Sequence, residues 1–508
     1  MPTRELRFFN LSSRRLRVTV FLGCLLVGVQ FPCCGQTSHV TKAAASDKVA
    51  LLLIRDSKSL PPEFAADVVL QVLESGASLT ASQKIGALKA GFDEAAQDQD
   101  DVLRRPWGAS AEETSEGLHA IALSAAQLDR ISQQARAVEY MAEIDPELAK
   151  LRLGAISPPR LDPIPCKATW IYLPDAYYNA VAKVIGTSFS PEEISAGRRA
   201  ELLTSVANGV VSHSQLLPVT RLLASADLSG AELASVLSSY IYALDRLRGD
   251  AHSFYWTAGR NSVDEFAALV SRLDSQGIGA LPLITSIRRY IVANFNTMPC
   301  SPLESPNDGK LPVAVQDFNN KFSKHLNAAG LSLITGEEIE GAVQDTAPAE
   351  VAPPRWESKE MSDLILSLQK LPDMPRENSA IEARYKDYLL QLNGWSNRSE
   401  PESDFFHQKA MLYFGVIERL GPSAMRTNVL IDFVKFLEQN SYHQVSRVDW
   451  FFYARRLLNL GARPAERADV VYALVSSGDP VLSIYGRLEL WKGMHASSQV
   501  SVSTKTTR

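Results

Sequence analysis

The chain has 508 residues, 45% of them hydrophobic, and a formal charge of −5 at pH 7. This hydrophobic fraction is normal for a globular protein and excludes a wholly disordered chain. The mild acidity and the lack of a long basic run argue against a nucleic-acid partner, because phosphate neutralisation needs clustered Lys and Arg. The length predicts two to four domains, since one domain usually has about 100–200 residues.

The N-terminal residues have the order of a secretory signal peptide. Five arginines precede an apolar run from Val18 to about Phe31, and small residues follow the run. The run has about 14 residues, whereas a membrane-spanning helix needs about 20. We therefore predict a signal peptide over residues 1–35, cleaved after Gly35, and an exported protein of the periplasm or the extracellular space.

The mature chain is then expected to have no transmembrane span. It keeps 47 basic and 56 acidic residues, so its formal charge is −9. Two alternatives stay open for the N-terminus. One is an uncleaved membrane anchor, since the apolar run is not far below spanning length. The other is a lipoprotein, for which Gly23-Cys24 is weakly suited.

Helix-start signals recur along the rest of the chain. In a capping box, a Ser or Thr hydroxyl accepts a backbone N–H, and an acid or amide three residues later accepts one in return. Apolar residues at three- and four-residue steps follow most of these starts, most clearly from Leu233 to Leu247, as in amphipathic helices. The six predicted boxes are Thr80/Gln83, Ser110/Glu113, Ser190/Glu193, Ser229/Glu232, Ser262/Glu265 and Thr335/Glu338.

Alternating runs typical of half-buried strands are nearly absent. The best extended candidate runs from Trp170 to Leu173 and stops at Pro174. We therefore predict an all-α protein, built of multi-helix hairpin or solenoid-like domains joined by proline-rich linkers, with little or no β structure.

Clusters of proline divide the chain, because proline lacks the N–H that a continuing helix needs. They lie at 158–165, at 299–312 and at 346–354. The predicted organisation is a helical domain at 36–157, a helical domain at 166–298, a proline-rich linker with short helices at 299–356, a helical domain at 357–496 and a disordered tail at 497–508.

The segment from Leu118 to Ala149 resembles a single tetratricopeptide-type hairpin, whose second helix ends near Asp145-Pro146. The resemblance implies two helices that pack against each other. No recurrence at the period of about 34 residues accompanies it, so it identifies no family.

Cysteine usage predicts one disulfide. Three of the five cysteines fall in the predicted signal, and Cys166 and Cys300 remain. An even pair in an exported chain suggests a bond between Cys166 and Cys300; the alternative is two separate thiols. Two cysteines without nearby histidines do not form a zinc site, and we predict no metal and no cofactor.

The segment from Arg246 to Arg260 has the densest chemistry in the chain. Its aromatic, Arg and His side chains are suited to a pocket for a sugar or an anionic ligand. The alternative is that the aromatic rings fill the core while the charges stay in water. The candidate ligand-binding residues are Arg246, Arg248, His252, Tyr255, Trp256 and Arg260.

Glu74-Ser75-Gly76 ends an apolar helical pattern and superficially resembles the Glu-Ser pair of lytic transglycosylases, in which the glutamate is the general acid. The downstream Gly- and Gln-containing motifs of those enzymes are absent. The alternative is a helix end with Gly76 as its C-terminal cap.

Two further runs are predicted to be structural. Asp98, Asp100 and Asp101 lack the glycine and the terminal glutamate of a calcium loop and indicate a solvated helix end. The aromatic run from Trp450 to Tyr453 indicates a helix buried between its neighbours; the alternative is a patch that contacts a membrane or a partner.

No P-loop, nucleophile elbow or His-Glu-x-x-His motif occurs. We therefore expect a non-enzymatic scaffold or binding module of the cell envelope, whose partner is an envelope protein or a glycan, since stacked hairpins expose long surfaces. One alternative is an envelope enzyme acting on glycans, for which two carboxyls about 5–10 Å apart, one with a raised pKa, would be evidence. Another is a membrane-associated assembly factor held by an uncleaved N-terminus.

Overall fold

The structure is a computed structural model, and it describes residues 37–106, 115–159, 161–166, 168–258, 262–295, 311–339, 358–374, 378–396, 402–440, 446–460 and 464–503. Helices dominate these ranges, and the protein is all-α, as the sequence predicts. In the part of the chain described here, no helix combines the length and apolar character needed to cross a membrane.

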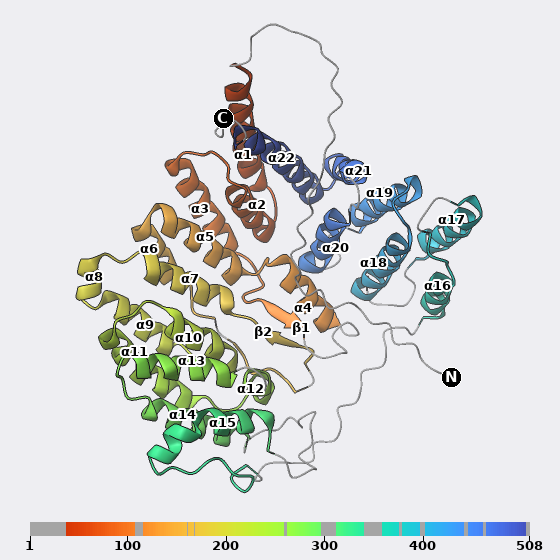
Figure 1. Ribbon diagram of the computed structural model, residues 1–508. Coiled ribbons are helices and arrows are strands. Elements are labelled where there is room, and N and C mark those ends of the chain that lie inside the picture. Colours follow the sequence, from red (N-terminus) through yellow and green to blue (C-terminus); the bar gives the residue numbers. More distant parts are fainter. Residues whose placement is uncertain are drawn as a thin grey trace.

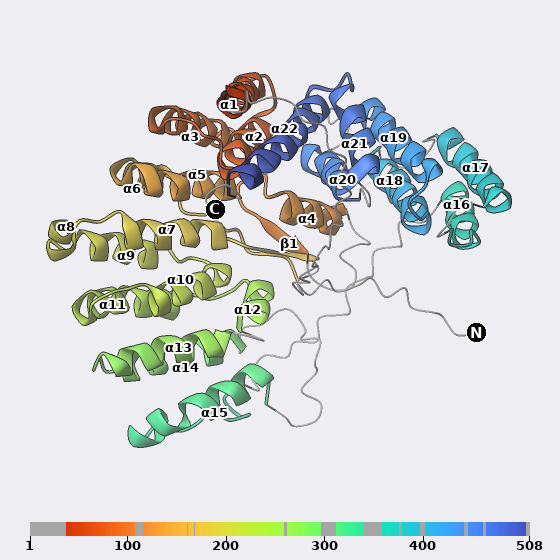
Figure 2. The same cartoon turned by 45° about the horizontal axis from the view of Figure 1, so that its top comes forward.

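The first part of the chain is a stack of helical layers (Figures 1 and 2). Its helices are α1 (Thr37–Ser57), α2 (Pro62–Glu74), α3 (Ala81–Ala95), α4 (Ser115–Ala126), α5 (Arg130–Ile144), α6 (Pro146–Ala155), α7 (Asp175–Thr187), α8 (Pro191–Ser195), α9 (Arg198–Asn208), α10 (His213–Ser225), α11 (Gly230–Arg246), α12 (Ala251–Ala258), α13 (Ser262–Ser275), α14 (Leu281–Phe295) and α15 (Val313–Ala328). One row of contacts runs through α3, α5, α7, α10 and α13 to α15, and a second runs through α9, α11 and α14. This arrangement is the predicted solenoid-like one.

The last part of the chain forms a second group of helices (Figure 2). They are α16 (Lys359–Gln369), α17 (Ser379–Gly394), α18 (Glu402–Arg419), α19 (Ala424–Gln439), α20 (Arg447–Asn459), α21 (Pro464–Val475) and α22 (Pro480–Ser503). The group packs back onto the start of the stack, because α22 contacts α1 and α2 while α20 contacts α4. We call this contact of α20 and α22 with α1, α2 and α4 the seam.

The apolar core is continuous across the seam, since one cluster of buried side chains extends from Ala50 to Trp491. The predicted domain boundaries stay predictions. The predicted signal at 1–35 lies outside the described residues, as do most of the proline cluster at 299–312 and all of the cluster at 346–354. Pro312 is described and is the N-cap residue of α15, which lies between the two clusters.

Local capping follows the sequence closely. Three predicted boxes form, those at Thr80, Ser190 and Ser229. At Thr335 the Glu338 carboxylate accepts the backbone N–H at 3.3 Å, but a turn follows instead of a helix. Ser262 is the first residue of α13, one position inside the expected start, and Ser110 lies outside the described residues. An unpredicted box at Ser212 starts α10.

The predicted extended segment is confirmed. β2 (Trp170–Tyr172) pairs with β1 (Arg104–Pro106) in an antiparallel two-stranded sheet, with Ile171 opposite Arg105. The buried aromatic run is confirmed as well, since Trp450 and Tyr453 of α20 have almost no exposed surface.

The tetratricopeptide-type hairpin is not formed as predicted. The helix that contains Leu118 is α4, which packs mainly against α20 and β1, whereas α5 pairs with α6. Gln127, between α4 and α5, has a φ of 53°, in the left-handed region. The chain therefore turns sharply after α4, and this helix becomes part of the seam.

Candidate functional site

A cavity of about 350 Å³ opens at the seam. Its lining residues come from α2, α4, α5, α20, α22 and the short connections after α2 and α4: Asp67, Gln71, Glu74, Ser75, Ala126, Gln127, Arg136, Arg455 and Lys492. We call it the junction pocket. Of these lining residues only Ala126 is apolar, and the three cations and two carboxylates give the lining a formal charge of +1.

Asp67 organises the wall of the junction pocket. Its side chain is only 1% exposed, although it lies on the apolar helix α2. The carboxylate accepts the Tyr485 hydroxyl of α22 at 2.7 Å, Arg136 Nη1 of α5 at 3.2 Å and the Gln71 amide of its own helix. Because a buried carboxylate must be paired, these contacts fix α5 and α22 against α2.

Arg136 joins the two carboxylates of the pocket. Its Nε and Nη2 lie 2.9 Å and 2.7 Å from Oε1 of Glu74. Burial opposes the charge on Arg136, but Asp67 and Glu74 outweigh it and raise the pKa of the guanidinium. Both contacts to Glu74 use the same carboxylate oxygen, so Oε2 has no hydrogen-bond partner within the described ranges.

The end of α2 is a helix C-cap, as the sequence predicts. Ser75 is the capping residue, and Gly76 follows with a φ of 82°, which favours glycine. The cap places Glu74 and Ser75 at the junction pocket.

Two further cations reach the pocket from the C-terminal helices. Arg455 Nη1 donates to the carbonyl of Ala126, the last residue of α4, at 2.8 Å. Lys492 donates to Oε1 of Gln71 at 2.6 Å and to Oε1 of Glu489 at 2.8 Å. Cations at helix C-termini are favourable, because the carbonyl groups there carry partial negative charge. Arg455 contacts no carboxylate among the residues that the structure describes.

A chain of titratable side chains crosses the seam between α4 and α20. His119 Nδ1 lies 3.0 Å from Asp449 and His119 Nε2 lies 3.5 Å from Asp100, while His407 Nε2 lies 3.4 Å from the other oxygen of Asp449. Burial opposes the charge on His119, but the bonds to Asp100 and Asp449 raise its pKa to about 9. Within the described part of the chain, no three His, Cys, Asp or Glu side chains are grouped as a metal site requires.

The acidic run before β1 is not the solvated helix end that the sequence predicts. Burial raises the pKa of Asp98 to about 8, and its Oδ2 has no hydrogen-bond partner among the described residues. Asp100 contacts His119, and only Asp101 is mainly exposed, 2.9 Å from Arg130. The reason is tertiary, since the backbone N–H of Arg130 binds the carbonyl of Asp100 and holds this loop against the start of α5.

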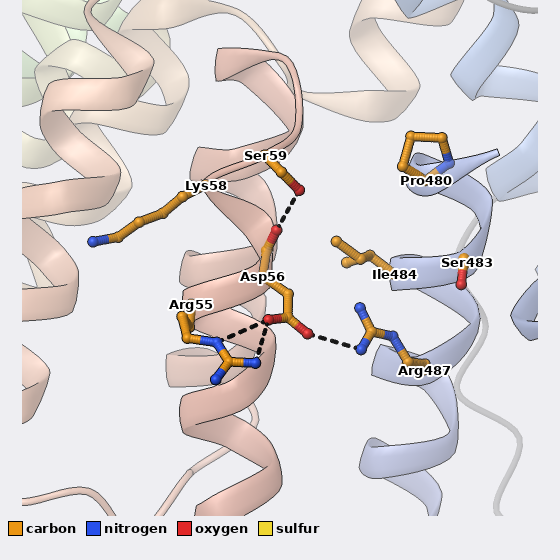
Figure 3. A pocket seen from close by; sticks show the side chains of 8 residues that line it. All are labelled: Arg55, Asp56, Lys58, Ser59, Pro480, Ser483, Ile484 and Arg487. Carbon is orange, nitrogen blue, oxygen red and sulfur yellow. Dashed lines mark hydrogen bonds and ion pairs between the residues drawn. The ribbon is translucent and has the colours of Figure 1, made fainter.

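A second cavity, of about 600 Å³, is an open groove between α1 and α22 (Figure 3). The Asp56 carboxylate lies 2.9 Å from both Arg55 and Arg487, and these hydrogen bonds, Arg487 first, lower its pKa. In Figure 3, Lys58 points away from this pair. The groove therefore contains an ion-pair link between the two helices, in which Asp56 already occupies the two arginines.

Arg246 and Arg248 of the sequence-predicted site line neither of these two cavities. The Arg246 guanidinium lies 4.4 Å over the ring of Tyr242, and Arg248 Nη1 donates to the carbonyl of Leu247 at 2.6 Å. Arg260 lies outside the described residues.

The rest of that segment is helix α12. His252 is buried, which lowers its pKa, and Tyr255 is half-buried. The structure does not describe the side chain of Trp256. Phe254 is 0% exposed and packs on Tyr290, so the core interpretation is confirmed for this ring. The ligand-binding role of the six residues stays a prediction.

Sequence reasoning missed the residues of the junction pocket other than Glu74 and Ser75. One signal was present: Asp67 is the only charged residue between Phe64 and Leu70. The predicted Cys166–Cys300 bond stays a prediction, because Cys300 lies outside the described residues.

The chain matches no protein-family model, no curated protein and no solved structure.

Proposed function

We propose that this protein is an exported binding module whose ligand enters the junction pocket. The observation that carries the proposal is a polar cavity lined by charged side chains from four helices, in which Asp67, Glu74 and Arg136 hold one another in place. Its volume of about 350 Å³ lies within the roughly 300–1,000 Å³ of small-molecule sites. Side chains that are ordered before binding reduce the entropy lost on association.

The signal-like order of residues 1–35 supports export. The stacked layers support a scaffold role toward an envelope protein or a glycan, since such stacks present extended surfaces. In this proposal the helices of the layers form part of the binding site, and the side chains of the junction pocket determine which ligand the site accepts.

The alternative is an enzyme acting on glycans, which needs one carboxyl as proton donor and a second as base or nucleophile. Asp67 and Glu74 are the two carboxylates that line the junction pocket, and both contact the guanidinium of Arg136. Asp98, whose pKa is raised to about 8, does not line it. The geometry therefore favours binding over hydrolysis.

A thermal-shift screen of the purified exported protein tests the proposal. The compounds would be amino acids, short peptides, sugars and nucleotides, and mass spectrometry would follow each compound for turnover. We expect one class to raise the unfolding midpoint of the wild type without being consumed. Steady consumption of a glycan would instead support the enzyme.

Two matched variants locate the site. Arg455→Met removes a lining cation, and we expect it to abolish the shift. Arg456→Met is the control, because this neighbouring arginine contacts Glu418 at 2.8 Å and does not line the pocket. A ligand that shifts Arg455→Met as strongly as the wild type binds elsewhere, and the proposal would then be wrong.

A further inference from the structure

We propose that the ligand of the junction pocket is dipolar, with a carboxylate and an ammonium group, as in a free amino acid or a short peptide. The inference depends on the proposed function and adds the chemical class of the ligand. It follows from which hydrogen-bonding groups the lining residues still have unused.

The unused donors are cationic. A guanidinium has five N–H groups, and the one contact of Arg455 within the described ranges is the bond from Nη1 to the Ala126 carbonyl. Lys492 has three N–H groups and uses two of them, on Gln71 and Glu489. A carboxylate fits here, since it is the group that a guanidinium binds through two parallel hydrogen bonds.

The unused acceptor is anionic. Oε2 of Glu74 has no partner among the described residues, and the side chain is 33% exposed. The C-terminal ends of α2 and α4, at Glu74 and Ala126, both reach the pocket and add partial negative charge. An ammonium group fits beside Glu74, because it can donate to Oε2 and is stabilised by both helix ends.

A ligand with a single charge fits less well. A purely anionic ligand would leave Glu74 Oε2 without a donor in the pocket, and a purely cationic ligand would leave the Arg455 donors without an acceptor. Among the described residues that line the pocket there is no aromatic ring on which a sugar could stack. At about 350 Å³ the pocket is at the small end for ligand sites, which suits an amino acid or the end of a short chain.

Calorimetry on the full exported chain tests this inference. The probes are the twenty standard amino acids and alanyl-alanine, which separate a free amino acid from a peptide as the source of the dipole. For the tightest probe, the N-acetyl, the C-terminal amide and the doubly blocked forms are then compared. We expect each single block to weaken binding by about tenfold or more and the double block to abolish it.

Two variants assign the charges. Arg455→Met should bind the parent probe about as weakly as the wild type binds its amide. Glu74→Gln should bind it about as weakly as the wild type binds the N-acetyl form. Arg456→Met is one control. The other is Glu143→Gln: Glu143 lies on the same helix as Arg136, and the substitution removes its exposed ion pair with Lys183. Circular dichroism confirms that each variant is folded.

Blocked probes that bind as tightly as the parent would overturn the inference. It would also be overturned if none of the twenty amino acids and alanyl-alanine bound measurably. The proposed function survives either result if the thermal-shift screen yields a ligand of another class that requires Arg455. If no ligand requires Arg455, the proposed function itself is wrong.

Discussion

The stacked layers and the seam bury polar groups in different ways. In the layers, His213 binds Tyr290 at 2.8 Å, and the hydroxyl of Thr220 binds that of Tyr240, so buried polar groups meet partners in the same or the next layer. At the seam, the Tyr485–Asp67 bond joins residues 418 positions apart. The seam therefore combines helices that share no local sequence context.

Both regions bury carboxylates. In the layers Glu232 pairs with Arg199, 33 positions away along the chain. The seam contains the buried carboxylates of Glu63, Asp67 and Asp449, and each of them contacts a cation or a histidine on another helix. Because an unpaired charge is expensive to bury, the seam collects several such pairs where distant helices meet.

The largest effect is expected in the layers. Phe254→Ala removes a fully buried ring that packs on Tyr290 and Phe295, and should lower the free energy of unfolding by about 3–5 kcal/mol. Urea unfolding measures this. Ligand binding at the junction pocket should be unchanged at temperatures where the variant is folded. A variant that is as stable as the wild type but no longer binds the ligand would indicate that the binding site lies in the segment from Arg246 to Arg260.

The next largest effect is expected at the seam, where the buried Asp67 carboxylate binds two other helices. Asp67→Asn keeps the size of the side chain but removes the charge that Arg136 and Tyr485 bind, and should cost about 2–3 kcal/mol. Amide hydrogen exchange should become faster in α22 of the variant than in α22 of the wild type, and the increase should be larger than in α13. Equal protection of α22 in both proteins would mean that Asp67 does not hold this helix.

The pH dependence of stability separates the regions further. The pKa of His119 is about 9 in the folded protein, and Asp100 and Asp449 face it. A histidine in the unfolded chain has a pKa of about 6.5. Its stabilisation is therefore complete below about pH 6.5 and is lost as the pH rises through about 9, on the order of 3 kcal/mol in all.

Asp98 acts in the same direction at lower pH. It loses its proton near pH 8 when folded and near pH 4 when unfolded, so the folded state loses stability from about pH 4 to 8. Unfolding midpoints should fall from pH 6 to 9.5 for the wild type. Between pH 8 and 9.5, above the titration of Asp98, they should fall much less for His119→Asn than for the wild type. His325→Asn, which removes a half-exposed contact with Asp274, is the matched control. A slope between pH 8 and 9.5 that is unchanged in His119→Asn would mean that another group causes it.

The smallest effect is expected where the ion pair is exposed. Glu201→Gln in the layers breaks the pair with Arg198, in which both side chains are about two thirds exposed. We expect a change below about 0.5 kcal/mol, because solvent screens such pairs. A loss as large as that of Asp67→Asn would remove the contrast between the two regions.

The helical class and many helix starts follow from local sequence patterns. Each capping box is complete within four residues, so Thr80, Ser190 and Ser229 needed no tertiary information. The extended segment at Trp170 and the cap after Glu74 were local in the same way.

The junction pocket, in contrast, depends on contacts between residues far apart in the sequence. His119 and Asp449 are 330 positions apart, and Arg455 reaches the end of α4 across a similar distance, so no spacing in the sequence records these contacts. Apolar periodicity predicts that a helix buries one face, but not which helix covers it. The return of α20 and α22 to the first helices brought Arg455 and Lys492 beside Asp67 and Arg136, because continuous burial of the core holds those faces together.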